Sequence, residues 1–277
     1  MSSRGERSIL IPSSYTMETA DMRQRTLKVG LIARAAAVFR IDRIVIYRDS
    51  DYDDTRFISL ILRYMETPQY RRKALFPRRR ELSHVGQLPP LRTAHHPVNS
   101  KSSTLKIGEF RVGVVAESVG SDGGAWVEIG SDRPVPLRTR EEVKVGQRLN
   151  VRIFSLNPLA AEQVDRKEIP GYWGYETVST DSPESYIRSR DLFVVATSRK
   201  GRLVDVRLLQ EIEKSSKSGL AVMFGSPARG VDAFLSQGML ERCCMINTIP
   251  HQGAETVRVE EAVFATLALL NLLRLEE

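Results

Sequence analysis

The sequence predicts an α/β fold, a parallel sheet with helices that is interrupted by a small β-barrel. Three features lead to this prediction. Apolar strands alternate with amphipathic helices before residue 70 and again after residue 171, and short alternating strands without a long helix lie between these parts. Two late strands end in loops rich in glycine and proline. The alternation of strands and helices is typical of a parallel sheet, and the short strands are typical of a small barrel. The glycine- and proline-rich loops are typical of the ligand-binding edge of an open α/β sheet.

The first part of the chain has the order β-α-β-α. A short strand over residues 8–11 ends at Pro12, and apolar residues at helical spacing (Leu27, Leu31, Ile32 and Ala35) predict a helix over 21–39 with these residues on one side. The β-branched content of residues 41–47 predicts a second strand. Residues 55–66 form the next predicted helix, which ends before Pro68.

The middle of the chain, residues 93–164, is predicted to be an inserted β-barrel. Alternating runs predict strands over 110–116, 125–129, 134–137 and 148–154, separated by turn residues. Residues 1–92 and 165–277 then form one discontinuous α/β domain around this insert. Trp126, Phe110 and Phe154 offer rings for base stacking on the insert, although core packing is the more common role of such residues.

The last part of the chain resumes the α/β alternation. Strands are expected over 192–196, 220–224 and 243–246, and helices over 204–214, 231–235 and 257–273. Three loops lie beside these elements: residues 196–201, 224–230 and 247–257. Because the carboxyl ends of parallel strands share one edge, we expect the exposed backbone groups of the three loops to hold an adenine-containing cofactor.

The composition restricts the class of protein. A chain of 277 residues with 42% hydrophobic and 27% charged residues has ample core for one large domain or two smaller ones. The sequence has no apolar run of membrane-spanning length, no signal peptide and only two adjacent cysteines, Cys243 and Cys244, so we expect a cytoplasmic protein with buried thiols and no membrane contact. The four histidines have no partner at metal-ligand spacing, and no metal is expected.

The positive charge is concentrated in one segment, residues 71–92. This segment has seven basic residues and one acidic residue, a surplus of six out of a net charge of +7. A concentrated and arginine-rich surplus indicates a surface for phosphate groups, with a solvated surface loop as the alternative. The expected RNA-binding residues are Arg71, Arg72, Lys73, Arg78, Arg79, Arg80 and Arg92.

Three motifs resemble those of the SPOUT (α/β-knot) RNA methyltransferases. Ile249-Pro250, Gly253 and Thr256–Val259 are similar to the cofactor loop and final helix of the tRNA ribose methyltransferases, and Arg258–Ala262 is similar to the Arg-Thr-Glu-Thr-Ala segment of the rRNA uridine-N3 branch. Lys28–Phe39 resembles the motif Asn-x-Gly-x-x-x-Arg-Thr-Ala-x-Ala-Phe, with Lys28 in place of Asn and Ala35 in place of Thr. The nearest subfamily is the archaeal and eukaryotic group with an OB-like insert, and the resemblance covers nearly the whole chain.

This resemblance implies a SPOUT-type sheet with a C-terminal trefoil knot, an OB-like barrel, a homodimer, S-adenosylmethionine as the cofactor and RNA as the substrate. It implies an in-line methyl transfer to a base or ribose of rRNA or tRNA, in a knotted cofactor pocket. The cofactor-binding residues would be Thr197, Ser198, Phe224, Gly225, Ser226, Gly230, Ile246, Asn247, Thr248, Ile249, Gln252, Gly253, Thr256 and Val257.

Three residues are the candidates for catalysis. Arg34, at the arginine position of the helix motif, would fix a phosphate or stabilise a developing oxygen charge; the alternative is a solvent-facing helix arginine. Glu260 would hold Arg258 or accept a proton from a uridine N–H, while an acidic residue in a first helical turn also complements the helix dipole.

A second class of function stays open. A non-catalytic RNA-binding protein that keeps the fold is compatible with the departures at Lys28 and Ala35. A nicotinamide or nucleotide enzyme is disfavoured because no glycine fingerprint follows the first strand.

Overall fold

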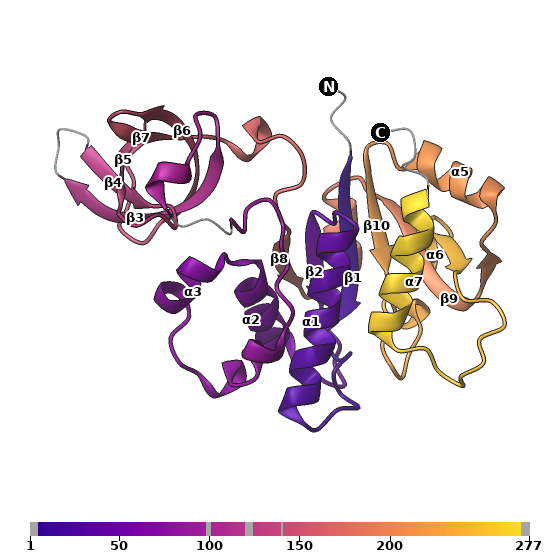
Figure 1. Ribbon diagram of the computed structural model, residues 1–277. Helices are drawn as coiled ribbons and strands as arrows, with labels where there is room; N and C mark the ends of the chain where they lie inside the picture. The colour runs from indigo at the N-terminus through magenta and orange to yellow at the C-terminus, as the bar shows by residue number, and fades with distance from the viewer. Residues whose placement is uncertain (1–4, 98–100, 120–123, 140, 273–277) are drawn as a thin grey trace. The chain divides into compact units, whose positions relative to one another are not determined.

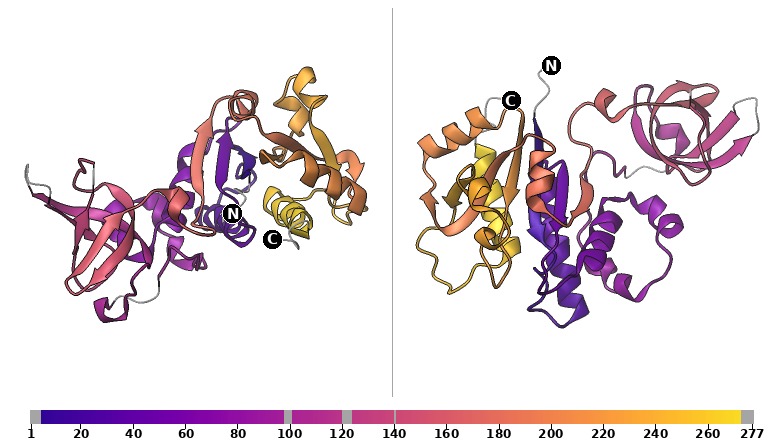
Figure 2. Two further views of the ribbon diagram at one scale, coloured as in Figure 1. Left: turned by 90° about the horizontal axis from the view of Figure 1, so that it is seen from above. Right: turned by 180° about the vertical axis from the view of Figure 1, so that it is seen from behind.

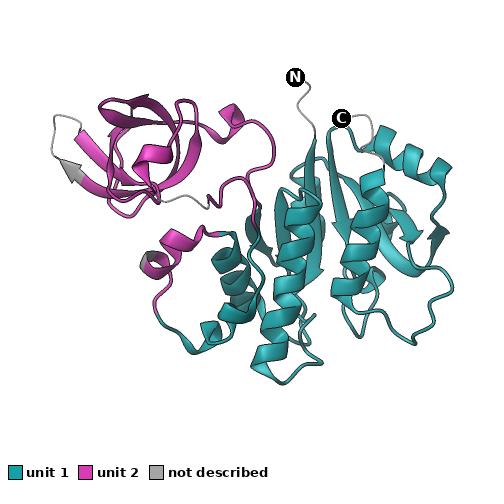
Figure 3. Cartoon of the chain, viewed as in Figure 1, with its two compact units in different colours: residues 1–66, 78–91, 175–277 teal, residues 67–77, 92–174 magenta. Residues whose placement is uncertain are grey.

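The computed structural model describes residues 5–97, 101–119, 124–139 and 141–272, and the chain divides into two compact units (Figure 3). Unit 1 comprises Met1–Glu66, Arg78–Leu91 and Tyr175–Glu277, and unit 2 comprises Thr67–Pro77 and Arg92–Gly174. The unit with the barrel therefore includes two segments, 67–77 and 165–174, that the sequence-based boundaries assigned to the α/β domain.

Unit 1 is built on a six-stranded sheet in which every pair of neighbours is parallel. Its strand order is β11-β9-β10-β1-β2-β8. The strands are β1 (Glu6–Pro12), β2 (Arg43–Tyr47), β8 (Glu176–Thr180), β9 (Phe193–Leu203), β10 (Gly219–Met223) and β11 (Cys244–Asn247). The predicted parallel sheet is thereby confirmed. Strand β8 was not predicted, and β9 is longer than expected.

Helices cover both faces of this sheet. One face carries α1 (Met22–Val38), α2 (Thr55–Glu66), α5 (Val206–Ser215) and α7 (Val259–Asn271), and the opposite face carries α4 (Pro183–Arg188) and α6 (Gln237–Leu240). Figures 1 and 2 show α1 and α7 next to one another on the same side of the sheet, and Figure 2 shows α4 on the other side. The expected helix at 231–235 is a single 3-10 turn over Val231–Ala233.

Helix α1 differs from its predicted orientation. Its start is fixed by Asp21, whose carboxylate accepts a hydrogen bond from the Gln24 backbone N–H (3.0 Å). Since α1 lies between α2 and α7 and also covers the sheet, small residues such as Ala33 and Ala36 fill its buried side. Leu27 (37% exposed) and Leu31 (44% exposed) remain at the surface, so the prediction that they share one side of the helix with Ile32 and Ala35, which are buried, is wrong.

Unit 2 contains a closed five-stranded barrel with the order β3-β4-β5-β7-β6. The strands are β3 (Phe110–Val119), β4 (Gly124–Glu128), β5 (Val135–Arg138), β6 (Arg148–Leu156) and β7 (Leu159–Gln163). Buried and exposed residues alternate along β4, β5 and most of β6, which places one side chain in two in the barrel core. The predicted barrel is confirmed, and β7 is an additional strand that the sequence LAAEQ does not indicate.

Helix α3 (Gln69–Leu75) explains why residues 67–77 belong to unit 2. The Tyr70 hydroxyl donates to the Val112 carbonyl (2.5 Å), and Arg71 forms an ion pair with Glu128. A Cβ atom at Gly130, where φ is +80°, would lie 2.6 Å from the Tyr70 ring. These contacts seat α3 on the barrel wall.

Candidate active site

The carboxyl ends of β1, β2, β9, β10 and β11 meet at one edge of the sheet, because all these strands are parallel. The first predicted cofactor loop lies within β9, and the other two follow β10 and β11 at this edge. The loops after β1 and β2 lie at the same edge. The arrangement therefore gathers five loops from distant parts of the sequence.

The first loop is an excursion within β9. Strand β11 pairs Met245 with Ala196 and then Ile246 with Arg202, so residues 197–201 leave the ladder between these two pairs. Gly201 is required here, since a Cβ atom would lie 2.5 Å from the Ile246 carbonyl carbon. The sequence prediction ended the strand at Ala196 and did not select Gly201 as a site residue.

Hydrogen bonds join this excursion to the other two loops. The Thr197 hydroxyl donates to the Met223 carbonyl (3.2 Å), at the start of the second loop. The Asn247 side-chain amide donates to the Arg199 carbonyl (3.1 Å), and the Arg199 guanidinium donates to the Glu255 carbonyl (3.2 Å). The three loops are thus in direct contact, as a shared binding site requires.

The second loop, residues 224–230, is a tight turn with little internal space. The Ser226 backbone N–H donates to the Arg229 carbonyl (2.8 Å), and the Arg229 N–H donates to the Ser226 hydroxyl (3.0 Å). A Cβ atom at Gly225 would lie 2.8 Å from the Arg229 carbonyl oxygen, so glycine lets this turn close. Phe224 is buried, and its carbonyl accepts a hydrogen bond from the Tyr47 hydroxyl (2.6 Å).

The Arg229 side chain ties the second loop to the loop after β2. Its guanidinium forms ion pairs with Asp49, which is buried, and with Asp51. Asp49 also accepts a hydrogen bond from the Ser14 hydroxyl (2.5 Å). Sequence reasoning did not select Arg229, because its carboxylate partners are about 180 residues away in the chain.

The third loop holds its shape through its own side chains. The Asn247 side-chain oxygen accepts from the Ile249 backbone N–H (3.0 Å), and Thr248 bonds Thr266 of α7 through their hydroxyls (2.9 Å). The Gln252 amide donates to the carbonyls of Ala254 (2.9 Å) and Glu255 (3.0 Å). Of the other predicted residues, Ile246 is buried in β11, Gly230 ends the second loop, and Ser198, Gly253, Thr256 and Val257 lie in the first and third loops.

Gly253 differs from Gly201 and Gly225. No protein atom lies within 4 Å of the position that a Cβ atom would occupy at Gly253. The fold itself therefore does not require glycine at this position, and the space beside its backbone is open to a ligand.

A buried polar cluster lies where the third loop enters α7. Glu260 and Lys28 are both buried, with 3.8 Å between the carboxylate Oε1 and the ammonium Nζ, and Lys28 also donates to the Tyr15 carbonyl (3.3 Å). Among the described residues, Glu260 Oε2 and the Tyr15 hydroxyl have no hydrogen-bond partner. Burial raises the pKa of the Glu260 carboxyl, although Lys28 and Arg258 oppose this shift. Such a carboxylate is a stronger base than a solvated one.

The nearest ion-pair partner of Glu260 corrects the sequence expectation. Glu260 pairs with Lys28 of α1 rather than with Arg258, which is exposed before α7. The Glu261 carboxylate accepts the Arg258 backbone N–H (2.9 Å) and so caps the helix. Lys28 is one of the two positions where the chain departs from the SPOUT helix motif, and this departure was the available signal.

Arg34 lies apart from this cluster. Its guanidinium donates to the carbonyls of Pro90 (3.1 Å) and Leu91 (2.8 Å). Arg34 is six residues beyond Lys28, roughly 9 Å along the helix axis, and α1 runs from the carboxyl edge of the sheet towards the amino edge. Within one chain, the structure therefore does not bring Arg34 together with Glu260.

The basic segment is divided between the two units. Arg78, Arg79 and Arg80 are exposed in unit 1, and Lys73 and Arg92 are exposed in unit 2. Arg71 is only 4% exposed and pairs with Glu128, so the expectation that it faces RNA is wrong: it holds α3 on the barrel. Arg72 is half-buried and donates to the Thr67 carbonyl (2.9 Å).

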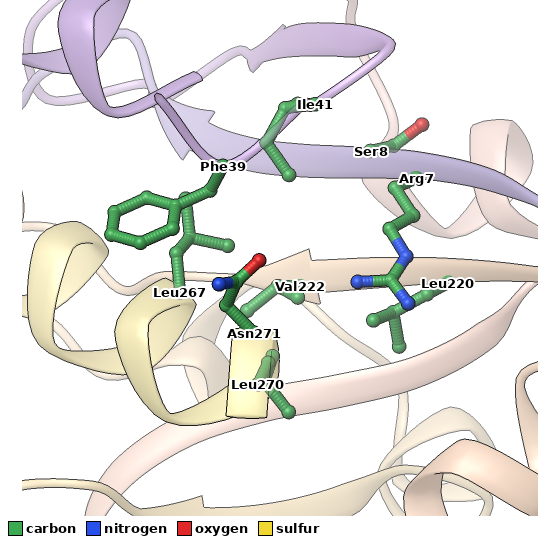
Figure 4. A pocket seen from close by; sticks show the side chains of 9 residues that line it. All are labelled: Arg7, Ser8, Phe39, Ile41, Leu220, Val222, Leu267, Leu270 and Asn271. Carbon is green, nitrogen blue, oxygen red and sulfur yellow. The ribbon is translucent and has the colours of Figure 1, made fainter. Parts of the chain in front are cut away.

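Two cavities in unit 1 lie away from the predicted loops. The one in Figure 4 lies near the amino edge of the sheet between β1, β10 and the end of α7, and its volume of about 10 Å³ holds at most one water molecule. The other, of about 450 Å³, is lined by residues of α4, β9 and α6, among them Arg188, Phe193 and Met239.

In the described part of the chain, no group of three or more metal-ligating side chains occurs, and no helix is long and apolar enough to cross a membrane. Cys243 and Cys244 are half-buried rather than fully buried as expected, and this partial burial raises the pKa of the Cys243 thiol to about 11.

Known proteins resemble this chain along nearly all of its length. The model of a family described as "Putative RNA methyltransferase" matches residues 6–270. An uncharacterized protein of Haloarcula marismortui is 36% identical over 285 residues, which cover 96% of this chain and 98% of the relative. The human 28S rRNA (uridine-N(3))-methyltransferase is 29% identical over 304 residues, which cover 95% of this chain and 77% of the human protein.

A solved structure with a more distant likeness is the SpoU methyltransferase AviRb from Streptomyces viridochromogenes, in complex with AdoMet. The identity is 10% and the TM-score is 0.39, and the match covers 100% of this chain and 63% of AviRb. The chain thus spans less than two thirds of the length of AviRb.

Proposed function

The chain belongs to this RNA methyltransferase family, and on that premise we propose that it transfers the methyl group of S-adenosylmethionine to N3 of a uridine in ribosomal RNA. The similarity to the human uridine-N3 enzyme over 95% of the chain is the observation that carries the proposal. The family match over residues 6–270 includes the three loops. The hydrogen bonds between the three loops support a shared binding site for the cofactor in this chain.

The residues at the carboxyl edge fit the cofactor. A nucleoside needs backbone donors and acceptors at close range. Since protein atoms fill the space beside Gly201 and Gly225, we place this contact at the third loop, where Gly253 is exposed. The open space beside Gly253 supports contact there. When bound, S-adenosylmethionine supplies an electrophilic methyl group on its sulfonium sulfur, so the protein has chiefly to position the two reactants and exclude water.

Uridine N3 carries a proton that must leave before or during methyl transfer. Glu260 is suited to help because burial raises its pKa, which strengthens it as a base near neutral pH. Lys28 keeps the carboxylate in place from α1. We therefore propose that Glu260, which is only 4% exposed, accepts the N3 proton and that Lys28 positions its carboxylate.

Two measurements test the proposed function. Calorimetry with S-adenosylmethionine should give a saturable heat, and incubation with unmethylated rRNA should yield 3-methyluridine in nucleoside mass analysis. Binding of RNA without heat from the cofactor would instead establish the non-catalytic RNA-binding protein. Methylation of a ribose oxygen would keep the enzyme but reject the uridine N3.

We also infer that the C-terminal segment is knotted. Helix α7 packs against α1, whereas β11, which precedes it, lies at the far edge of the sheet beyond β9 and β10. The connection must therefore return past these two strands, and the Arg199–Glu255 bond supports a passage beside the β9 excursion. An experimental structure whose chain trace closes without threading would reject the knot.

A homodimer is the assembly that we propose for unit 1. Leu27, Leu31 and Val38 form an exposed apolar stripe along α1, and Leu272 is exposed at the end of α7 (37%, 44%, 51% and 56% exposed). Burying such residues between two copies is favourable by about 25 cal/mol per Å² of apolar surface. Leu31→Glu should convert the dimer to a monomer in analytical ultracentrifugation, and a monomeric parent protein would reject the assembly.

We infer further that the barrel of unit 2 is OB-like. Its strand order 1-2-3-5-4, with the first and fourth strands paired and the third and fifth strands parallel, supports this fold type.

A further inference from the structure

The outer wall of the barrel is covered in some places and bare in others. Trp173 packs with Phe110, Val112 and Ile169 over part of β3, and its indole N–H donates to the Asn150 side chain of β6 (2.9 Å). Helix α3 covers the region around Val112 and Gly130. Trp126 belongs to neither cluster and is 39% exposed, the more exposed of the two tryptophans in the chain.

Trp126 begins a row of outward residues that runs around the wall of the closed barrel over four strands. It stands opposite Pro136 of β5, and the next outward residue of β5 is Arg138. Arg138 stands opposite Glu162 of β7, which in turn stands opposite Arg152 of β6. Phe154 is the next outward residue of β6 and the last residue of this row. It lies at a bulge, where the β6–β7 register shifts between Ile153 and Ser155 and the direction of the side chains changes.

The side chains of this face are held in fixed positions. The Arg138 guanidinium lies 4.5 Å from the centroid of the Phe154 ring and donates to Glu162 Oε2 (2.5 Å). Arg152 donates to the other carboxylate oxygen of Glu162 (2.5 Å). Because one carboxylate orients two guanidinium groups, these three residues carry a net positive charge, and Glu168 also attracts Arg152. The arginines are 67% and 40% exposed and Glu162 is 15% exposed, so the cations face solvent and the anion lies beneath them.

This combination of rings and cations matches a polyanion with flat bases. We propose that Trp126, Phe154, Arg138 and Arg152 form a stacking platform that binds a single-stranded segment of the RNA substrate. The platform rests on the proposed function, since it assumes that the substrate is RNA. One base stacks on Trp126 in a sequence-tolerant manner, a second stacks on the Arg138 guanidinium that lies over the Phe154 ring, and Arg152 contacts a phosphate. Duplex RNA does not fit, because its base faces are already stacked.

The test uses the full chain and a fluorescently labelled single-stranded oligouridylate of about ten nucleotides, a length within the usual range for one small barrel. Binding is measured by fluorescence anisotropy as a function of salt. Trp126→Leu should weaken binding by roughly 5- to 100-fold and leave the slope of log K against log salt unchanged, because stacking releases no counterions. Arg138→Gln should weaken binding and also reduce the slope by about one unit.

Two controls keep the result specific. Ile107→Ala changes another exposed apolar side chain of unit 2 (68% exposed) and should leave affinity unchanged. A duplex of the same length should bind the Trp126→Leu protein and the parent protein equally well. Unfolding curves identical to those of the parent would show that Trp126→Leu folds normally.

The possible outcomes separate the platform from the methyl-transfer activity. Parental affinity of Trp126→Leu for the oligouridylate overturns the platform, even if the protein methylates rRNA. Loss of affinity in Trp126→Leu but not in Ile107→Ala supports the platform, even if the parent protein transfers no methyl group. Equal losses in both variants also overturn it, because they would indicate a non-specific effect.

Discussion

Lys28 of α1 and Glu260 of α7 form a buried ion pair across 3.8 Å, although 232 residues separate them in the chain. The pair joins the first helix of the sheet to the helix that follows the third candidate cofactor loop. Lys28 also donates to the Tyr15 carbonyl, which brings the loop after β1 into the same cluster. Stability and site geometry are therefore coupled at this point.

Loss of Lys28 should leave the Glu260 carboxylate buried without its cation. We expect Lys28→Met to lower the free energy of unfolding at pH 7 by about 3 kcal/mol, measured by urea denaturation. Lys28→Met combined with Glu260→Leu should recover most of this loss, because the double variant buries no charge. A double variant whose loss equals the sum of the two single losses would show that the residues are not coupled.

The raised pKa of Glu260 predicts a pH dependence of stability. The folded protein holds the Glu260 proton to a higher pH than the unfolded chain, whose carboxyl titrates near 4.5. Between the unfolded-state and folded-state pKa values, the folded protein binds more protons than the unfolded chain. The contribution of Glu260 to the free energy of unfolding is therefore fully present below pH 4.5, and it is lost as the pH rises through the folded-state pKa. Relative to Glu260→Gln, the parent protein should lose unfolding free energy over this range. Parallel pH profiles of the two proteins would contradict the burial effect.

Gly201 should be essential for the β9 excursion. A Cβ atom in Gly201→Ala would lie within 2.8 Å of three backbone atoms of Ile246, and neither strand can move without breaking the ladder. We expect a loss of at least about 2 kcal/mol in unfolding free energy, together with weaker cofactor binding. Gly86→Ala is the matched control, since no atom lies within 4 Å of its added methyl group. Comparable stability of the two variants would reject the tight contact.

Gly253 offers the opposite test, in which stability stays constant and binding changes. Since no protein atom lies within 4 Å of its Cβ position, Gly253→Ala should unfold at the same urea concentration as the parent protein. If the cofactor occupies the space beside this backbone, the methyl group should weaken S-adenosylmethionine binding at least about tenfold in calorimetry. Parental affinity in this variant would place the cofactor elsewhere.

The arginines of the basic segment should divide into two functional groups. Replacing Arg78, Arg79 and Arg80 with glutamine should reduce the slope of log K against log salt for RNA binding by up to about 2.7, with little change in stability. Arg71→Ala should instead lower the stability of the protein by about 2 kcal/mol, because it leaves Glu128 without its partner and removes a buried contact of α3. An unchanged salt slope in the triple variant would remove these residues from the RNA interface.

Local patterns in the sequence were sufficient for most of the fold. The β-branched run at 41–47 was predicted because the strand is buried on both faces. The amphipathic helix at 55–66 and the alternating strands of the barrel were predicted because each buries one face. The strand β7 (LAAEQ) and the short helices α3 and α4 were missed, since their residues have weak or mixed preferences and depend on packing. Packing also decided the exposure of Leu27 and Leu31. Helix α1 contacts α2 and α7 as well as the sheet, and the side with these two leucines is the one left at the surface.

Composition, periodicity and motifs alone identified the parallel sheet, the inserted barrel, the three loops and the excess of arginine at 71–92. Folding in three dimensions settled which of these residues meet. It paired Glu260 with Lys28, turned Arg34 towards the 90–91 carbonyls, buried Arg71 against the barrel and left Trp126 bare on its wall. A sequence records neighbours along the chain, whereas burial and ion pairing depend on distances across it, and those distances exist only once the layers have packed.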